Sequence, residues 1–173
     1  MSDPQAAAAR PPATVREGRE SDVEAVVDMV RELAEYERAA DQVRLTPDQL
    51  RRALFAGAAP DGSPAAYLLV AEDEGRTVGF ALWFLNFSTW EGVHGIYLED
   101  LYVRPDHRGS GAGRALLTAL ARIAAERGYA RVEWSVLNWN EPAIGFYAKI
   151  GAVPQDEWTT YRLTGSALAS LAR

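Results

Sequence analysis

The sequence predicts a mixed α/β fold in which helices flank a central, largely antiparallel sheet. Two β-prone apolar runs, residues 67–72 and 77–86, are separated only by Asp73-Glu74-Gly75-Arg76, which is typical of an antiparallel hairpin. A third such run, residues 94–103, follows closely and precedes a glycine-rich loop and a long helical pattern. The predicted order of elements is β-α-α-β-β-β-α-β-α-β-α.

The elements before the hairpin are a short strand and two helices. A strand is expected over residues 14–17, and Ser21-Asp22-Val23-Glu24 fits a capping box that opens a helix running to about Glu37. The second helix starts at Thr46-Pro47-Asp48-Gln49, with proline at the first helical position, and ends near Gly57.

The elements after the third strand alternate between helix and strand. Gly128 is a typical C-terminal stop for the long helix, and Asn140 can cap the helix that follows. In order, we expect a helix over 109–127, a strand over 131–137, a helix from 140 to 151, a strand over 157–163 and a helix over 166–171.

Length and composition indicate one globular domain. The chain has 173 residues, of which 48% are hydrophobic and 24% charged, and we expect a single domain over 14–173 behind a disordered tail over 1–13. A net charge of −6 argues against a nucleic-acid partner, which would need a basic surface. The longest apolar run, residues 78–87, is too short for a membrane span. We therefore expect a cytoplasmic protein with neither a nucleic-acid nor a membrane partner.

Two kinds of chemistry are disfavoured by the residues present. The chain contains no cysteine, which excludes disulfides, thiolate metal sites and cysteine nucleophiles. His94 and His107 are its only histidines and have no ligand-like spacing around them. The sequence therefore predicts no metal cofactor.

The most specific motif is Arg108-Gly109-Ser110-Gly111-Ala112-Gly113, between the third strand and the long helix. Glycines let several backbone amides turn toward one point, and the helix dipole adds to the attraction for an anion there. A diphosphate would fit, with Arg108 and Arg114 supplying charge. The alternative is a glycine-rich helix start that binds no ligand.

Two other phosphate-binding motifs do not match. A P-loop needs Gly-Lys-Ser/Thr, which occurs nowhere in the chain. A dinucleotide fingerprint that begins at Gly109 would need a glycine where Arg114 stands. The remaining pattern, R/Q-x-x-G-x-G/A, is the loop with which GNAT acetyltransferases hold the diphosphate of coenzyme A.

The surrounding strings resemble that family. LEDLYVRPDHRGSGAG and LNWNEPAIGFYAKIGA are similar to the two GNAT motifs beside coenzyme A. ELAEYER, FSTWEG, YLEDLYV, WNEPAIGFY and the late Trp158 together resemble its diamine and thialysine acetyltransferase branch, which includes the spermidine/spermine acetyltransferases. The resemblance implies the GNAT fold, acetyl-CoA as co-substrate, a small-molecule amine as acceptor and a homodimer. It places cofactor binding at Leu101, Tyr102, Val103, Arg108, Gly109, Ser110, Gly111, Ala112, Gly113, Arg114, Asn140 and Tyr147.

Acetyl transfer to a primary amine needs a base and an acid. An alkylammonium with a pKa of about 10.4 must lose a proton before it attacks, and the resemblance makes Glu99 the base, acting through water. Alternation along a strand would turn Glu99 and Asp100 to opposite faces unless a bulge intervenes. The resemblance places the general acid at Tyr147, which would protonate the departing thiolate. The alternatives are that either carboxylate is structural, that Tyr147 only packs and that Asn140 only caps its helix.

Acidic and aromatic side chains are the candidates for amine binding. Carboxylates and aromatic rings can hold an alkylammonium by ion pairing and cation–π contact. These candidates are Tyr36, Glu37, Trp90, Glu99, Asp100 and Trp158. Polyamine acetyltransferases of this branch carry an acidic residue where this chain has Ser88, which favours a thialysine-like amino acid over a diamine or polyamine. The alternative is that the aromatic residues only pack.

Two other functions remain open, a protein or peptide N-acetyltransferase and a non-catalytic acyl-CoA sensor.

Overall fold

A five-stranded sheet forms the centre of the fold, with strand order β1-β2-β3-β4-β5. The computed structural model describes residues 13–55, 57 and 61–173, so the tail predicted over 1–13 lies outside this description except for Ala13. The strands are β1 (Thr14–Glu17), β2 (Tyr67–Asp73), β3 (Arg76–Ser88), β4 (Val93–Val103) and β5 (Val132–Glu133). β1 to β4 pair antiparallel and β5 pairs parallel to β4, which confirms the predicted mixed, mostly antiparallel sheet.

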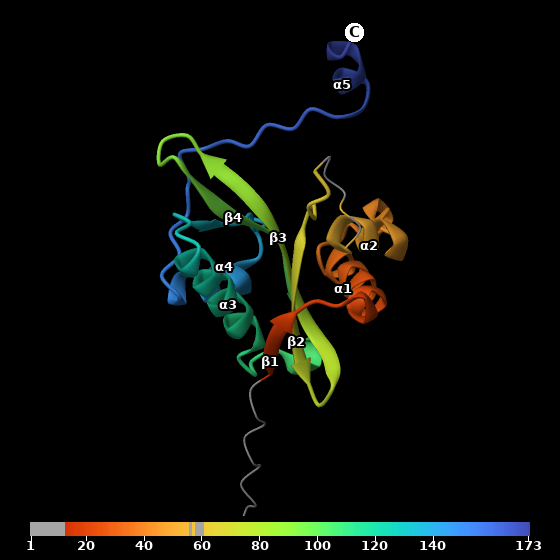
Figure 1. Cartoon of the computed structure of the whole chain (residues 1–173), viewed down its shortest axis with the longest axis vertical. Coiled ribbons are helices and arrows are strands. Elements are labelled where there is room, and N and C mark those ends of the chain that lie inside the picture. The colour runs from red at the N-terminus through yellow and green to blue at the C-terminus, as the bar shows by residue number, and fades with distance from the viewer. Residues whose placement is uncertain (1–12, 56, 58–60) are drawn as a thin grey trace, which may run out of the picture. The chain divides into compact units, whose positions relative to one another are not determined.

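The helices lie on both faces of this sheet. Figure 1 shows α1 (Val23–Tyr36) and α2 (Pro47–Phe55) on one face and α3 (Ala112–Glu126) on the other. Short 3-10 turns, at Glu20–Asp22, Ala40–Gln42 and Pro105–His107, precede or connect them. The helices α4 (Glu141–Lys149) and α5 (Gly165–Leu171) follow β5 in sequence. No helix among the described residues is both long enough and apolar enough to span a membrane.

The main core lies between the sheet and the pair α1 and α2. Residues of α1 spaced by three and four, such as Val23, Val26 and Val27, have at most 1% of their surface exposed. They pack with Phe80 of β3 and Tyr102 of β4 in one cluster. The other face of the sheet is covered by the buried side of α3, which comprises Ala112, Leu116, Leu117, Leu120 and Ala124. Both faces of the central strands are therefore covered.

The chain divides into two compact units, residues 1–135 and 136–173. The first contains the whole sheet and α1 to α3, and the second contains α4 and α5. The strand predicted over 157–163 was wrong, because this segment is irregular and exposed in the structure. A β-prone run becomes a strand only where a neighbouring strand accepts and donates its backbone hydrogen bonds. The strand predicted over 131–137 is likewise reduced to Val132–Glu133.

Three helix starts were predicted from capping residues, and two are confirmed. Thr46 Oγ1 accepts from the Gln49 amide at 3.3 Å, while Gln49 Oε1 accepts from the Thr46 amide at 2.8 Å. Asn140 Oδ1 accepts from the Ala143 amide at 3.3 Å. The capping box at Ser21 was wrong, because a 3-10 turn over Glu20–Asp22 precedes α1.

Asp22 explains this different start. Only 4% of its surface is exposed. It accepts two bonds from Arg16, at 2.7 and 2.9 Å, one from the Arg19 amide at 2.8 Å and one from Thr77 Oγ1 at 3.0 Å. Burial alone would raise the pKa of Asp22, but these donors together hold it below its ordinary value. One carboxylate therefore connects β1, the start of α1 and β3.

Asp22→Asn should lower the free energy of unfolding at pH 7 by about 2 kcal/mol, because it removes the charge-assisted bonds from Arg16, which then keeps Glu72 as its carboxylate partner at 2.8 Å. A carboxylate with a lowered pKa stabilises above its unfolded pKa of 3.8, so the difference should shrink as the pH falls below that value. Urea unfolding of both proteins at pH 7 and pH 3 measures this. Asp28→Asn, in an exposed pair with Arg31, is the control and should change stability by less than about 0.5 kcal/mol. An equally small effect of Asp22→Asn would contradict the prediction.

Candidate active site

A β-bulge in β4 sets the direction of the predicted carboxylates. Leu82 of β3 pairs with Asp100 and Trp83 with Leu98, so Glu99 is an extra residue without a partner on β3. Leu82 packs against the core below α1 and α2. Because paired residues share one face of a sheet, Asp100 lies on the α1 side. The sequence did not decide whether a bulge occurs here, and the structure contains one.

Three carboxylates carry charge close to one another at this place. Glu99 is exposed, Asp100 is mostly buried, and Glu37 immediately follows the last turn of α1. Burial, followed by the negative charges of Glu99 and Glu37, raises the pKa of Asp100 from 3.8 to about 6. Burial also raises the pKa of Glu37. The cluster is a negative, partly desolvated environment suited to an alkylammonium.

The glycine-rich loop begins the helix α3 with an exposed set of amides. Gly109 and Gly111 have φ angles of 77° and 91°, and a Cβ built on either would meet nothing within 4 Å. The Ala112 amide donates to Ser110 Oγ at 3.4 Å, and Ala115 is the first residue of α3 whose amide donates to a backbone carbonyl, Gly111 O, at 2.9 Å. Within the described residues, the amides of Gly113 and Arg114 have no such acceptor. Open space beside the glycines and free amides at a helix start fit a diphosphate.

The residues just before the loop hold it in place. Only 8% of the surface of His107 is exposed. Its Nε2 atom lies 3.4 Å from Oδ2 of Asp73 on β2, and its Nδ1 atom lies 2.9 Å from Oδ1 of Asp106. Its carbonyl accepts from Ser110 Oγ at 2.7 Å. The sequence analysis considered His107 only as a metal ligand and missed this supporting role, which depends on Asp73, a residue 34 positions away by number.

Among the described residues, β5 leaves the second half of its neighbour β4 unpaired. β5 pairs only with Ile96 and Tyr97. The Arg104 amide bonds to Val78 O on β3 at 3.0 Å, and amide directions alternate along a strand. The amides of Leu101 and Val103 therefore point away from β3, on the side where β5 has already ended. This is where the sequence analysis expects backbone contacts to the cofactor.

Arg108 is held differently from the sequence-based expectation. Its Nε donates to Val103 O at 3.0 Å. Its guanidinium carbon lies 5.1 Å from the centre of the Tyr36 ring and 5.5 Å from that of Tyr102. Arg108 was predicted to bind diphosphate and Tyr36 to bind the amine, but nothing in the sequence indicated that the two side chains meet.

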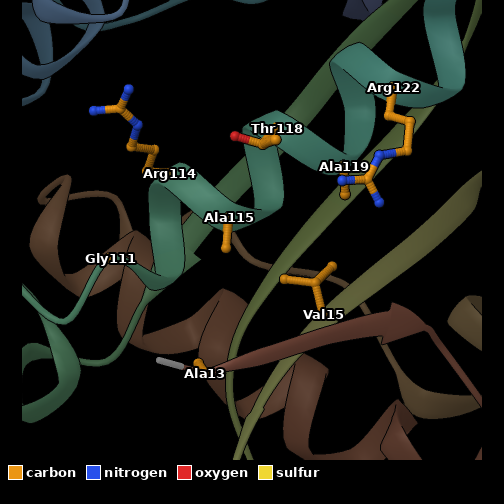
Figure 2. A pocket seen from close by; sticks show the side chains of 8 residues that line it. All are labelled: Ala13, Val15, Gly111, Arg114, Ala115, Thr118, Ala119 and Arg122. Atoms are coloured by element: carbon orange, nitrogen blue, oxygen red, sulfur yellow. The ribbon is translucent and has the colours of Figure 1, made fainter. Parts of the chain in front are cut away.

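Arg114 lines a hollow of about 450 Å³ along the outer side of α3. Figure 2 shows Arg114, Thr118 and Arg122 following one another along the helix above Val15 of β1. The full lining is Ala13, Val15, Gly111, Arg114, Ala115, Thr118, Ala119 and Arg122. Thr118 and Arg122 were not predicted to lie beside Arg114. The three residues follow one another at intervals of four, which could have indicated a shared helix face.

The remaining predicted residues are in two other places. Trp90 is 89% exposed in the turn between β3 and β4, where Ser88 Oγ accepts from the Glu91 amide at 3.2 Å. Glu99 lies six positions after Val93 along β4, a distance of about 20 Å in a strand. A single copy of the chain therefore does not bring Trp90 to the carboxylates. Asn140, Tyr147 and Trp158 belong to the second unit, in which the Tyr147 ring lies 5.4 Å from Phe146 and Trp158 is 72% exposed.

Asp100→Asn should stabilise the fold in a pH-dependent way. A buried carboxyl with a raised pKa keeps its proton where the unfolded chain has lost it, so it costs stability as the pH rises from 3.8 to about 6. The variant should therefore gain up to about 3 kcal/mol at pH 8 and nothing below about pH 4. Thermal and urea unfolding at both pH values measure the gain, and exposed Asp41→Asn is the control. A gain that does not depend on pH would contradict the prediction.

Comparisons with known proteins agree with this geometry. Residues 26–152 match the acetyltransferase (GNAT) family. The thialysine N-epsilon-acetyltransferase of Bos taurus is 35% identical over 164 residues, which cover 91% of this chain and 96% of that protein. The L-ornithine N5-acetyltransferase of Arabidopsis thaliana is 44% identical over 93 residues, covering 54% of this chain and 41% of that protein.

A solved structure supports the same assignment at the level of the fold. An integron cassette protein from the mobile metagenome of V. cholerae has a TM-score of 0.74 and 25% identity, covering 94% of this chain and 98% of its own. The family match spans the loop at Arg108 and the helix that carries Tyr147. The chain belongs to the GNAT family of acetyltransferases, and it is an acetyl-transferring enzyme.

Proposed function

We propose that this enzyme transfers an acetyl group from acetyl-CoA to a side-chain primary amine of a small cationic amino acid such as thialysine or ornithine. The observation that carries the proposal is the order of groups along β4 and the loop after it. A carboxylate cluster that favours a cation is followed by a strand edge that β5 leaves unpaired and then by a helix start that favours an anion. An ammonium substrate and a diphosphate cofactor need these two environments on one path, with the pantetheine arm between them.

The cofactor side of the proposal uses backbone groups. Bound acetyl-CoA supplies an activated thioester carbonyl from which the acetyl group is transferred. The amides of Gly113 and Arg114 would hold its diphosphate, with the side chain of Arg114 adding charge. The amides of Leu101 and Val103 would bind its pantetheine arm along β4. Asn140 and Tyr147 are further contacts that the family resemblance implies.

The amine side uses the carboxylates. We infer that Asp100 and Glu37 attract and orient the ammonium, with Tyr36 beside them, and that exposed Glu99 accepts its proton through water. The neutral amine then attacks directly in a ternary complex. The chain has no cysteine that could form an acyl-enzyme. Trp90 and Trp158 remain predicted substrate contacts, and the homodimer remains a prediction.

The general acid is assigned to Tyr147 on α4, whose hydroxyl would give a proton to the departing thiolate. Because the family match over 26–152 crosses the boundary between the two units, we also propose that both units form one acetyltransferase domain.

The substrate class is tested by release of coenzyme A from acetyl-CoA with a panel of amines. Thialysine and ornithine should stimulate release most, spermidine less, and a peptide with a free N-terminal amine little. Ser88 lacks the negative charge that a second ammonium would need, which is the reason for the weaker response to spermidine. Acetylation of peptides alone would instead indicate a protein N-acetyltransferase, and tight binding of coenzyme A without turnover would indicate a sensor.

Tyr147→Phe should lower kcat by about 100-fold or more, because proton transfer by a positioned side chain contributes at least that much. The dissociation constant of acetyl-CoA should stay nearly unchanged, since the ring remains. Stopped-flow acetylation and titration calorimetry measure the two quantities. Tyr161→Phe, at a tyrosine of the same unit that is 92% exposed, is the matched control. Wild-type turnover in Tyr147→Phe would remove this residue from the mechanism.

A further inference from the structure

The loop that would hold the cofactor touches the helix that would hold the amine through one side chain. Arg108 opens the loop, and its guanidinium lies over the ring of Tyr36, in the last turn of α1, at 5.1 Å. The same guanidinium lies 5.5 Å from the Tyr102 ring on β4. Both distances are within the range in which a cation and an aromatic face attract each other. Arg108 therefore bridges two elements that are far apart in sequence.

The partners of Arg108 are themselves fixed. Tyr102 is 5% exposed, and its hydroxyl donates to Glu32 Oε2 of α1 at 3.2 Å. Arg104 Nη2 lies 3.3 Å from Glu32 Oε1. Glu32 thus ties α1 to the end of β4 by two contacts, and Tyr36 follows one helical turn later on the same side. The surface on which Arg108 rests is a rigid junction between α1 and β4.

Arg108 is held by its own hydrogen bonds as well as by the two rings. A guanidinium has five N–H donors in one plane. The Nε donor is used by Val103 O at 3.0 Å, and Arg108 is also a side-chain hydrogen-bond partner of Tyr102. These contacts keep the guanidinium between the loop, β4 and the end of α1.

We propose that Arg108 is a positioning residue whose stacking on Tyr36 couples the cofactor loop to the amine-binding end of α1. This inference rests on the proposed function and deepens it. Affinity for coenzyme A then depends on an aromatic ring at position 36, although that residue lies on the amine side. An amine that rests on Tyr36 then changes the affinity of the enzyme for coenzyme A. Because linkage is reciprocal, coenzyme A changes the affinity for that amine by the same factor.

The test measures binding of coenzyme A by titration calorimetry without any amine. Tyr36→Leu should raise the dissociation constant about two- to fivefold, the amount expected from losing a cation–π contact at an exposed site. Tyr36→Phe keeps the ring and should bind coenzyme A more tightly than Tyr36→Leu does. Phe55→Leu, at a partly exposed aromatic residue of α2, is the control for truncating a ring elsewhere.

Arg108 gives an independent second measurement. Arg108→Lys keeps the charge but loses the planar stack and the bond to Val103 O. It should weaken binding almost as much as Arg108→Gln does. The double variant Tyr36→Leu/Arg108→Gln should bind no more weakly than Arg108→Gln alone, because both changes remove the same contact.

Each outcome has a distinct meaning. Wild-type affinity in Tyr36→Leu, full rescue by Arg108→Lys, or additive effects in the double variant would overturn the coupling and leave Arg108 as a simple charge. Failure of the wild type to bind coenzyme A would instead overturn the proposed function. If Tyr36→Leu does not fold, as judged by thermal unfolding, the comparison of Arg108→Lys with Arg108→Gln still decides the question.

Discussion

At Glu99, β4 carries one residue more than β3, and the geometry of the whole candidate site depends on that single insertion. The extra residue leaves Leu98 and Asp100 on opposite faces of the sheet, opposite Trp83 and Leu82 respectively. Asp100 consequently turns toward α1, where burial and the charges of Glu99 and Glu37 raise its pKa to about 6. Without the bulge, strand alternation would place Asp100 and Leu98 on the same face. The carboxylate cluster is thus a consequence of strand register.

The same strand places two opposite electrostatic environments in series. Its middle carries negative charge, and its end leads to amides and arginines that favour negative ligands. An enzyme that joins an ammonium to the thioester of a diphosphate-containing cofactor needs both, separated by the pantetheine arm that links the diphosphate to the thioester. Among the described residues β5 pairs only with the first half of β4, so β5 leaves the strand edge between the two environments unpaired. One strand thereby organises much of the proposed chemistry.

The side chains that support this arrangement are mostly not the ones that carry chemistry. His107 and Asp73 hold the glycine-rich loop against the β2–β3 hairpin, and Glu32 joins α1 to Tyr102. Arg108 rests on Tyr36 and is also the residue proposed to meet an anion. A residue shared in this way would let a site made from separate elements bind two ligands in a dependent way.

The sequence by itself determined what local chemistry controls. It predicted the β2–β3 hairpin, the caps at Thr46 and Asn140, and a glycine-rich helix start, because turns, caps and positive φ angles depend on neighbouring residues. Only the tertiary structure decided the rest. The bulge at Glu99 needs the register of β3, and the raised pKa of Asp100 needs its burial in the folded chain. The stack of Arg108 on Tyr36 joins segments about seventy positions apart, like the Glu32–Tyr102 bond. The segment 157–163 was wrongly predicted as a strand for the same reason, because its β propensity did not supply a neighbouring strand to pair with.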